Sequence, residues 1–329
     1  MDYKLLGRTG MLVSELCFGT MSFGGDADEQ TSADMFAKCR DAGINFFDCA
    51  NVYSEGRSEE ILGRLISNCR NELVITSKVF GPMGSHPNSG GLSRRHITQA
   101  VEDSLRRLQT DRIDLYFVHQ FDEFTPIEET VRTLDDLVRQ GKILYPAVSN
   151  WSAWQTMKAV GHARNTGLAP FVCLQPMYNL VKRQAEVELL PLAESEGLGV
   201  IPYSPVGGGL LAGKYSRSQR PESGRLIDSP RYTNRYRDET YFDIAERFTA
   251  AALQHDVHPV SLAVAWVASH SAVTAPIIGA RNLEQLQPSL DSVNFRLTAA
   301  ARNEISQLSP EPPLPTDRSE ERTEWKSSP

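Results

Sequence analysis

The amino-acid sequence predicts an α/β protein, a (β/α)8 TIM barrel with an N-terminal β-hairpin and long loops at the C-terminal face. Two observations lead to this fold class. Short apolar runs rich in β-branched and aromatic residues alternate eight times with amphipathic stretches, and such alternation indicates parallel strands with helices outside. No G-x-G-x-x-G follows the first of these strands, as a doubly wound open sheet would require. Eight units that close on themselves form a barrel.

The predicted elements follow in chain order. Residues 3–6 and 11–16 form the hairpin strands around the turn GRTG. The barrel strands are expected at 17–20, 44–48, 73–78, 113–119, 143–149, 171–175, 199–204 and 274–279. The helices are expected at 31–43, 58–69, 93–109, 126–141, 152–167, 185–197, within 238–270 and at 282–293. Ser93 is the expected N-cap of the third helix, and Pro146 is expected to cause a bulge in its strand.

Two segments depart from the alternating pattern. Residues 206–237, after the seventh strand, read as a long loop that begins GGGLLAGKY and carries several arginines. Residues 309–329 are rich in proline and charge and are expected to form a polar tail, at least partly mobile, beyond a single barrel domain at 1–308. Trp325 is unusual in such a tail, and it either docks on the barrel mouth or stays unpacked.

Composition excludes some classes of function. The chain has 329 residues, of which 23% are charged and 40% hydrophobic, and its net charge is −7. That charge argues against a general nucleic-acid or anionic-membrane binder. No apolar stretch approaches the length of a membrane span, and the first ten residues lack the apolar core of a signal peptide. We therefore expect small-molecule partners, and the sequence leaves the oligomeric state open.

The cysteines indicate a reducing compartment. There are five, an odd number, and none lies in a CxxC motif. Several fall within predicted strands or helices, where a free cysteine acts as a small apolar residue. This usage predicts a cytoplasmic location. Cys49, next to Asp48, is either a reactive thiol or, as we expect, a packing residue.

Four polar side chains lie at or just beyond the C-terminal ends of predicted strands. They are Asp48, Tyr53, Lys78 and His119. In a barrel these strand ends share one face, which holds the active site. The four residue types suit a proton relay, because an ammonium stabilises a phenolate and a carboxylate can hold the ammonium in place. His119 could donate a hydrogen bond to a carbonyl oxygen or assist the proton transfer.

Long segments of the chain resemble the aldo-keto reductase family, in particular the branch of potassium-channel β subunits and aryl-alcohol dehydrogenase-like enzymes. The matching segments are YKLLGRTGMLVSELCFGTMSFGG, FDCANVYSEGRSEEILGRLI, SLRRLQTDRIDLYFVHQFD, VSN, LQPMYNL, IPYSPVGGGLLAGKY and IIGARNLEQL. They extend over residues 3–295. The resemblance implies an oxidoreductase that reduces carbonyls reversibly, with Tyr53 as general acid, Lys78 and Asp48 tuning it, and His119 orienting the carbonyl.

The resemblance also implies a nicotinamide cofactor bound at the C-terminal end of the barrel. The residues implied are Ser149, Asn150 and Gln175 for the carboxamide, Tyr203 for stacking on the ring, Ser204, Leu210, Gly213 and Lys214 on the pyrophosphate side, and Gly279, Arg281 and Gln285 for the adenosine phosphate. Backbone N–H groups at a helix start suit a phosphate, and Arg281 can add charge-assisted bonds. NADP(H) is therefore favoured over NAD(H).

The substrate is less well marked. Met21, Phe23, Phe80, Phe121 and Trp151 lie on rim loops and could line an apolar pocket for an aromatic or aliphatic aldehyde. Two other functions remain open: an NADP(H)-sensing regulatory subunit with slow turnover, and a metal-dependent barrel hydrolase. The hydrolase would need several His and carboxylate ligands on strand ends, where only Asp48 and His119 qualify, so we expect no metal.

Overall fold

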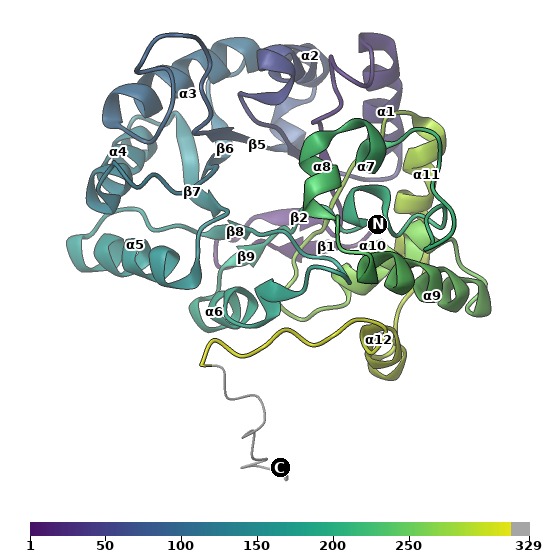
Figure 1. Ribbon diagram of the computed structural model, residues 1–329. Helices are drawn as coiled ribbons and strands as arrows, with labels where there is room; N and C mark the ends of the chain where they lie inside the picture. Colours follow the sequence, from purple (N-terminus) through teal and green to yellow (C-terminus); the bar gives the residue numbers. More distant parts are fainter. Residues whose placement is uncertain (317–329) are drawn as a thin grey trace.

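A computed structural model describes residues 1–316 of the chain (Figure 1). Eight parallel strands form one sheet in the order β10-β3-β4-β5-β6-β7-β8-β9. Their bounds are β3 (Cys17–Gly19), β4 (Phe46–Asp48), β5 (Val74–Val79), β6 (Ile113–Val118), β7 (Ile143–Ser149), β8 (Cys173–Gln175), β9 (Gly199–Val200) and β10 (Ile277–Ile278). The amides of Thr274 and Ile277 donate to the carbonyls of Val200 and Pro202 at 2.9 Å, so the two outer strands also meet. The predicted (β/α)8 barrel is confirmed.

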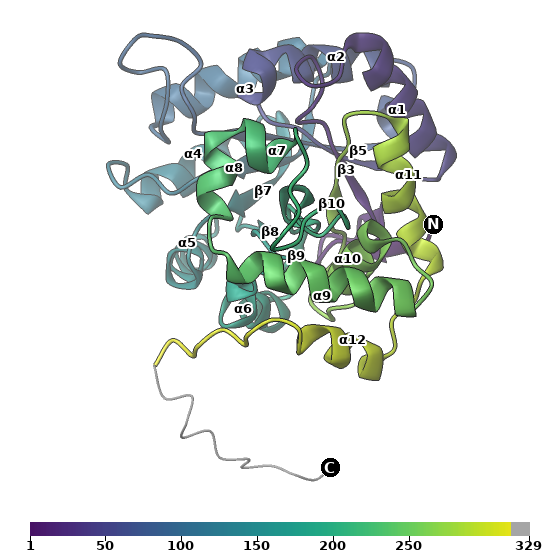
Figure 2. The ribbon, with the colours of Figure 1, turned by 45° about the vertical axis from the view of Figure 1, so that its right-hand side comes forward.

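Helices surround the sheet, as Figures 1 and 2 show. The α-helices are α1 (Glu29–Asp41), α2 (Arg57–Ile66), α3 (Arg94–Leu108), α4 (Ile127–Arg139), α5 (Ala153–Thr166), α6 (Leu189–Glu196), α7 (Arg225–Asp228), α8 (Pro230–Arg235), α9 (Thr240–Gln254), α10 (Pro259–Ala268), α11 (Leu283–Asp291) and α12 (Ala299–Ser306). Short 3-10 turns lie at η1 (Tyr53–Gly56), η2 (Arg70–Glu72), η3 (Gln184–Glu186), η4 (Gly207–Gly209) and η5 (Ser292–Asn294). Ser93 caps α3 by accepting from the His96 amide, as predicted.

The strand side chains alternate between two apolar layers, as the period of a strand requires. On β4, Phe46 faces the barrel interior while Phe47 packs under the helices. On β6, Leu115 lies in the interior and Tyr116 in the outer layer. All four side chains are fully buried. The strands therefore carry apolar residues on both faces, which explains their continuous hydrophobic runs.

The predicted N-terminal hairpin seals one end of the barrel. Strands β1 (Tyr3–Leu5) and β2 (Leu12–Ser14) pair antiparallel. Leu6 and Val13, fully buried, pack in the interior cluster with Cys17 and Val74, which lie at the starts of their strands. The hairpin thus covers the amino-terminal end of the strands, opposite the end at which the four polar residues were predicted.

The bulge predicted at Pro146 is wrong. The β6–β7 register is regular through Tyr116↔Pro146 and its neighbours on either side. The Pro146 carbonyl points toward β8, where it accepts from the amide of Val172. The N–H and C=O of one strand residue point to the same side, so the N–H that proline lacks would also point toward β8. Strand β8 begins only at Cys173, and the ladder therefore loses no partner there.

Two further elements differ from the prediction. The segment expected to be a long loop contains α7 and α8, and α12 forms where no helix was predicted. In Figures 1 and 2, α7 and α8 lie in front of the strands, nearer the viewer, rather than in the outer ring of helices. Trp325 and most of the predicted tail lie outside the described residues.

Candidate active site

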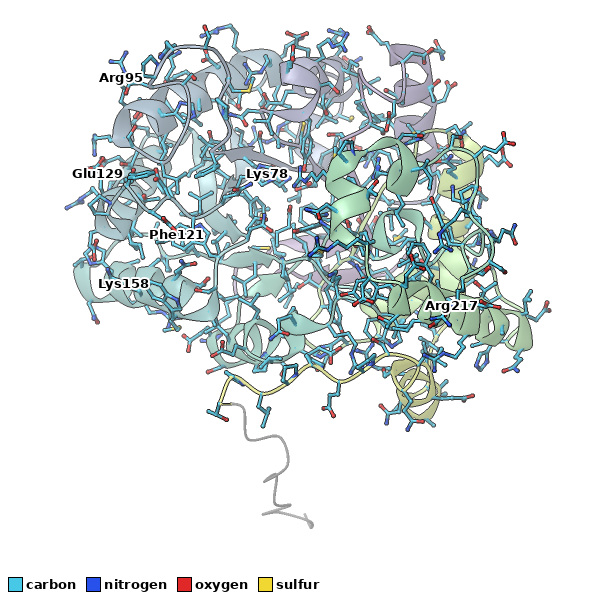
Figure 3. All side chains as sticks on the ribbon, in the orientation of Figure 1. Lys78, Arg95, Phe121, Glu129, Lys158 and Arg217 are labelled. Atoms are coloured by element: carbon cyan, nitrogen blue, oxygen red, sulfur yellow. The ribbon has the colours of Figure 1, made fainter. Side chains whose placement is uncertain are left out.

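The four predicted polar residues come from three neighbouring strands. Asp48 is the last residue of β4, and Tyr53 opens the turn η1 that follows it. Lys78 lies one residue before the end of β5, and His119 follows directly after β6. Since parallel strands end at the same edge, the four side chains converge, as predicted. Figure 3 shows Lys78 inside the ring of helices.

Lys78 is the centre of the cluster. Its ammonium donates to the Asp48 carboxylate at 2.6 Å and to the Cys49 carbonyl at 2.8 Å. It also donates to the Tyr53 hydroxyl oxygen at 3.3 Å. The side chain is fully buried, so these three contacts take the place of water. A buried ammonium in contact with a phenol is an arrangement that can stabilise a phenolate.

Both oxygens of the Asp48 carboxylate accept hydrogen bonds from neighbouring side chains. Its second oxygen accepts from the Thr76 hydroxyl at 2.7 Å and from the Gln175 amide nitrogen at 2.8 Å. Asp48 keeps the pKa of Lys78 above its ordinary value, against the lowering that burial alone would cause. Lys78 is therefore a cation at neutral pH despite its complete burial.

Burial controls the proton of Tyr53. Desolvation raises the pKa of this phenol to about 12, and the opposing charge of Lys78 offsets only part of the increase. Without a bound ligand, Tyr53 is thus a protonated phenol over the whole physiological range. The side chain is ready to donate its proton rather than accept one.

His119 stands next to Tyr53. The ring centroids are 6.2 Å apart, and the planes meet at 78°. Burial, then the positive charges of Lys78 and Arg231, lower the pKa of His119 to about 3. The imidazole is therefore neutral at pH 7. It can donate a hydrogen bond, but it cannot act as an imidazolium acid there.

The residues expected around a nicotinamide lie together at the ends of β7, β8 and β9. Ser149 and Gln175 are register partners on adjacent strands. The Tyr203 hydroxyl donates to the side-chain carbonyl of Asn150 at 2.7 Å, and the Asn150 amide donates to the His119 carbonyl at 2.9 Å. Asn150 has φ of 58°, a left-handed conformation that is uncommon for a non-glycine residue. This strain fits a side chain held in place for binding.

The residues expected on the pyrophosphate side fall into two groups. Gly213 and Lys214 are exposed, and Gly213 has φ of 83°. Ser204 is half-buried with φ of 58°, and its carbonyl accepts from Asn179. Leu210 is fully buried in the core, so its side chain is not available to a ligand.

At the start of α11, Gly279 and Gln285 are exposed and Arg281 is partly exposed. The guanidinium of Arg281 pairs with Asp26 at 3.1 Å, and Arg225 reaches the same carboxylate at 3.6 Å. Sequence reasoning missed Asp26, which lies in the loop after β3. No local signal could have revealed it, because the contact spans most of the chain.

The apolar residues expected at the rim are only partly accessible. Met21 is exposed and Phe80 half-buried, whereas Phe23 is fully buried and does not reach the rim. Trp151 is buried and stacks edge-on against Phe121 with centroids 5.0 Å apart. Of these residues, only Trp151 lines the cavity of about 310 Å³, whose lining also includes Asn150, Gln175, Met177 and Tyr203. This space adjoins the nicotinamide candidates.

Comparison with known proteins decides the family. The profile of the Aldo/keto reductase family matches residues 15–310. The chain belongs to this family. The predicted resemblance is therefore confirmed, and an oxidoreductase function follows at the level of the family.

Several relatives of this aldo/keto reductase are similar over most of their length. A Bacillus subtilis protein named uncharacterized oxidoreductase YrpG is 37% identical over 95% of this chain and 97% of its own. A probable voltage-gated potassium channel subunit beta from Arabidopsis thaliana is 36% identical over 94% and 96%. Norsolorinic acid reductase from Aspergillus flavus is 33% identical over 93% and 80%. The names cover both catalysts and channel subunits.

Two structural features are absent from the described part of the chain. Among residues 1–316, no group of three or more His, Cys, Asp or Glu side chains is placed to hold a metal ion. In the same part of the chain, no helix has the length and apolar character needed to cross a membrane. We refer to Asp48, Tyr53, Lys78 and His119 together as the tetrad.

Proposed function

We propose that this protein reduces aldehyde or ketone carbonyls to alcohols with NADPH, and catalyses the reverse oxidation, with Tyr53 as general acid. The observation that carries the proposal is the position of the Lys78 ammonium, 2.6 Å from the Asp48 carboxylate and 3.3 Å from the Tyr53 hydroxyl. This geometry stabilises negative charge on the phenol oxygen at the moment when its proton leaves.

Each residue of the tetrad has a role in the proposal. Tyr53 gives its proton to the carbonyl oxygen, and Lys78 stabilises the phenolate that remains. Asp48 fixes Lys78 and keeps it charged. His119, neutral at pH 7, donates a hydrogen bond that orients the carbonyl oxygen. When bound, NADPH would supply the hydride.

The residues around the site fit a nicotinamide dinucleotide. Asn150 and Gln175 offer amide groups that suit a carboxamide, and Tyr203 offers a flat ring beside them. Lys214 is exposed and has no ion pair among residues 1–316. Arg281 brings a second cation to the amino terminus of α11, where backbone N–H groups also favour a phosphate. A cation at this place favours NADP(H) over NAD(H).

The test is NADPH consumption, followed by absorbance, against a panel of aromatic, aliphatic and sugar aldehydes. Tyr53→Phe is the matched variant, since it removes only the hydroxyl, and NADH is the cofactor control. We expect turnover by the wild type to fall at least a thousandfold in Tyr53→Phe, roughly the contribution of a proton donor, with NADPH binding retained. If neither nicotinamide cofactor binds, the proposal is wrong.

A second candidate is an NADP(H)-sensing regulatory subunit with slow turnover. The plant relatives named as potassium channel β subunits favour it, at 36% identity over about nine-tenths of this chain or more. The same assay separates the two functions. Tight NADPH binding with no turnover of any aldehyde would favour the sensor, because the tetrad would then serve binding alone.

We also propose a cytoplasmic location for the protein. All five cysteines are free thiols, and four of them are buried. A reducing compartment suits this arrangement, because it protects thiols from oxidation. Fractionation of cells that express a tagged chain would test it.

A further inference from the structure

The arginines of the segment between β9 and α9 divide into two groups. Three are held in ion pairs: Arg217 with Asp243 at 3.2 Å, Arg220 with Glu239 at 3.0 Å, and Arg225 with Asp26 at 3.6 Å. The other three, Arg231, Arg235 and Arg237, have no carboxylate at ion-pair distance within residues 1–316. The paired arginines brace the segment, and the unpaired ones are available to a ligand.

The helix α8 places two of these unpaired side chains together. Arg231 and Arg235 are four residues apart on α8, so they lie on the same face of the helix. Arg235 lies over the ring of Tyr232, with its guanidinium carbon 5.1 Å from the ring centroid, a contact that restrains the long side chain. Two guanidinium groups of this kind form a suitable site for a planar oxyanion.

Tertiary contacts fix α8 over the loops that follow β8 and β9. The Tyr232 ring packs so closely on Gly208 that a Cβ there would lie 2.8 Å from it. Tyr236, directly after α8, is buried, and its hydroxyl accepts from the Asn179 amide at 3.2 Å. The helix is therefore attached to the rim of the barrel through Tyr232 and Tyr236 and is not a free surface segment.

The positive charge of α8 reaches the tetrad side of the site. Burial and Lys78 make the larger contributions to the lowered pKa of His119, and the charge of Arg231 lowers it further. The charge of Arg231 also lowers the pKa of Tyr203, against the increase that burial causes. Arg235 acts on Tyr203 too, against the effect of burial, which raises the pKa of that phenol. Asn179 donates both to the Tyr236 hydroxyl at 3.2 Å and to the Ser204 carbonyl at 2.9 Å, so the end of α8 is joined to the residue next to Tyr203. The helix therefore lies at the rim, beside the loop that carries Tyr203, a residue of the cavity lining.

We propose that Arg231 and Arg235 bind an anionic group on the substrate, so that this reductase prefers carbonyl compounds that carry a carboxylate or a similar oxyanion. The inference rests on the proposed function, since it names the substrate class of the same site. The candidate phosphate ligands Lys214 and Arg281 lie on other loops, which leaves the α8 pair for the substrate. The carbonyl then lies toward Tyr53, with the anion at the rim.

The test compares 4-carboxybenzaldehyde with its methyl ester, which has the same ring and carbonyl but no charge. The variants are Arg231→Gln, Arg235→Gln and the double variant. Arg95→Gln is the control, because Arg95 is also an exposed arginine but lies at the edge of the molecule on α3 (Figure 3). We expect kcat/KM for the acid to fall about tenfold in the double variant, while the ester and the NADPH Kd stay within twofold of wild type.

Two outcomes would overturn the proposal. If the ratio of kcat/KM for the acid to kcat/KM for the ester is unchanged in the double variant, the arginines do not recognise the charge of the substrate. A weaker NADPH Kd in the double variant, with the acid-to-ester ratio kept, would show that they hold the cofactor instead.

If wild type turns over neither aldehyde, calorimetric titration of the NADP⁺ complex with terephthalate decides separately. If wild type binds terephthalate and the double variant does not, the anion site is supported even though the reductase function has failed. Equal terephthalate binding in both proteins, or none in either, removes the anion site as well.

Discussion

The side-chain amide of Gln175 donates to the Asp48 carboxylate at 2.8 Å, on the oxygen opposite the one that holds Lys78. Gln175 ends β8 and Asp48 ends β4, so the bond crosses the barrel between strands that are not neighbours. A residue expected at the nicotinamide is thereby joined to the tetrad. One substitution should therefore affect both cofactor binding and turnover.

Gln175→Met tests this connection. It keeps the volume but removes a hydrogen bond to a charged group, which is worth about 1.5–3 kcal/mol. We expect kcat to fall roughly tenfold or more and the NADPH Kd to rise. Gln184→Met is the control, because Gln184 lines the same cavity without a bond to Asp48. Equal effects of the two substitutions would contradict the assignment.

The pH dependence of the two reaction directions should differ. Reduction needs the protonated phenol, and a pKa of about 12 for Tyr53 keeps that proton on at all lower pH values. His119, with a pKa of about 3, does not titrate near neutrality either. We expect kcat for reduction to be flat between about pH 6 and 9, while alcohol oxidation rises with pH because it needs the phenolate. A reduction profile with a midpoint near pH 7 would contradict both assignments.

Arg107→Met should destabilise the fold strongly. Arg107 pairs at 2.7 Å with Glu59, a fully buried carboxylate that also accepts from the Ser77 hydroxyl at 2.5 Å. Removing the arginine leaves a buried charge without its partner, which costs about 3–5 kcal/mol. Urea denaturation measures the free energy of unfolding.

Two further variants control this result. Arg106→Met removes an exposed arginine on the same helix, paired with Asp103, and should change stability by less than about 1 kcal/mol. Adding Glu59→Gln to Arg107→Met should recover part of the loss, since it removes the stranded charge. No recovery would mean that lost packing, not charge, explains the effect.

The native thiols should react with Ellman's reagent at one position. Cys69 alone is partly exposed, whereas burial raises the pKa of the Cys49 thiol to about 12 and keeps it inert. We expect about one fast thiol per chain, which disappears in Cys69→Ser, and five in urea. Fast labelling of Cys49 in the folded protein would instead indicate a reactive thiol beside the tetrad.

The sequence predicts the barrel and the tetrad because both leave local signals. Buried parallel strands read as apolar runs, and the polar residue that ends each run, such as Asp48 or Lys78, marks the face of the site. The exposed loops and the hairpin turn are likewise marked by glycine and charge. These features depend on residues that are close together in the sequence, so one amino-acid sequence is enough to predict them.

Other features depend on contacts between distant residues. The helix α8 is short and polar, and it forms because Tyr232 and Tyr236 pack on loops far away in the chain. The pairing of Asp26 with Arg281 joins an exposed and a partly exposed charge and leaves no pattern in the sequence. The high pKa of Tyr53 follows from burial, which residue type alone does not reveal.

The hairpin that packs Leu6 and Val13 into the amino-terminal end of the strands has a consequence for ligand traffic. Because the hairpin closes this end of the barrel, there is no second entrance. Every molecule that reaches Tyr53 therefore enters and leaves at the same rim. When two molecules occupy one entrance, the molecule bound deeper in the site can leave only after the molecule bound nearer the rim has left. The order of arrival and release thus depends on a hairpin at the opposite end of the barrel from the rim.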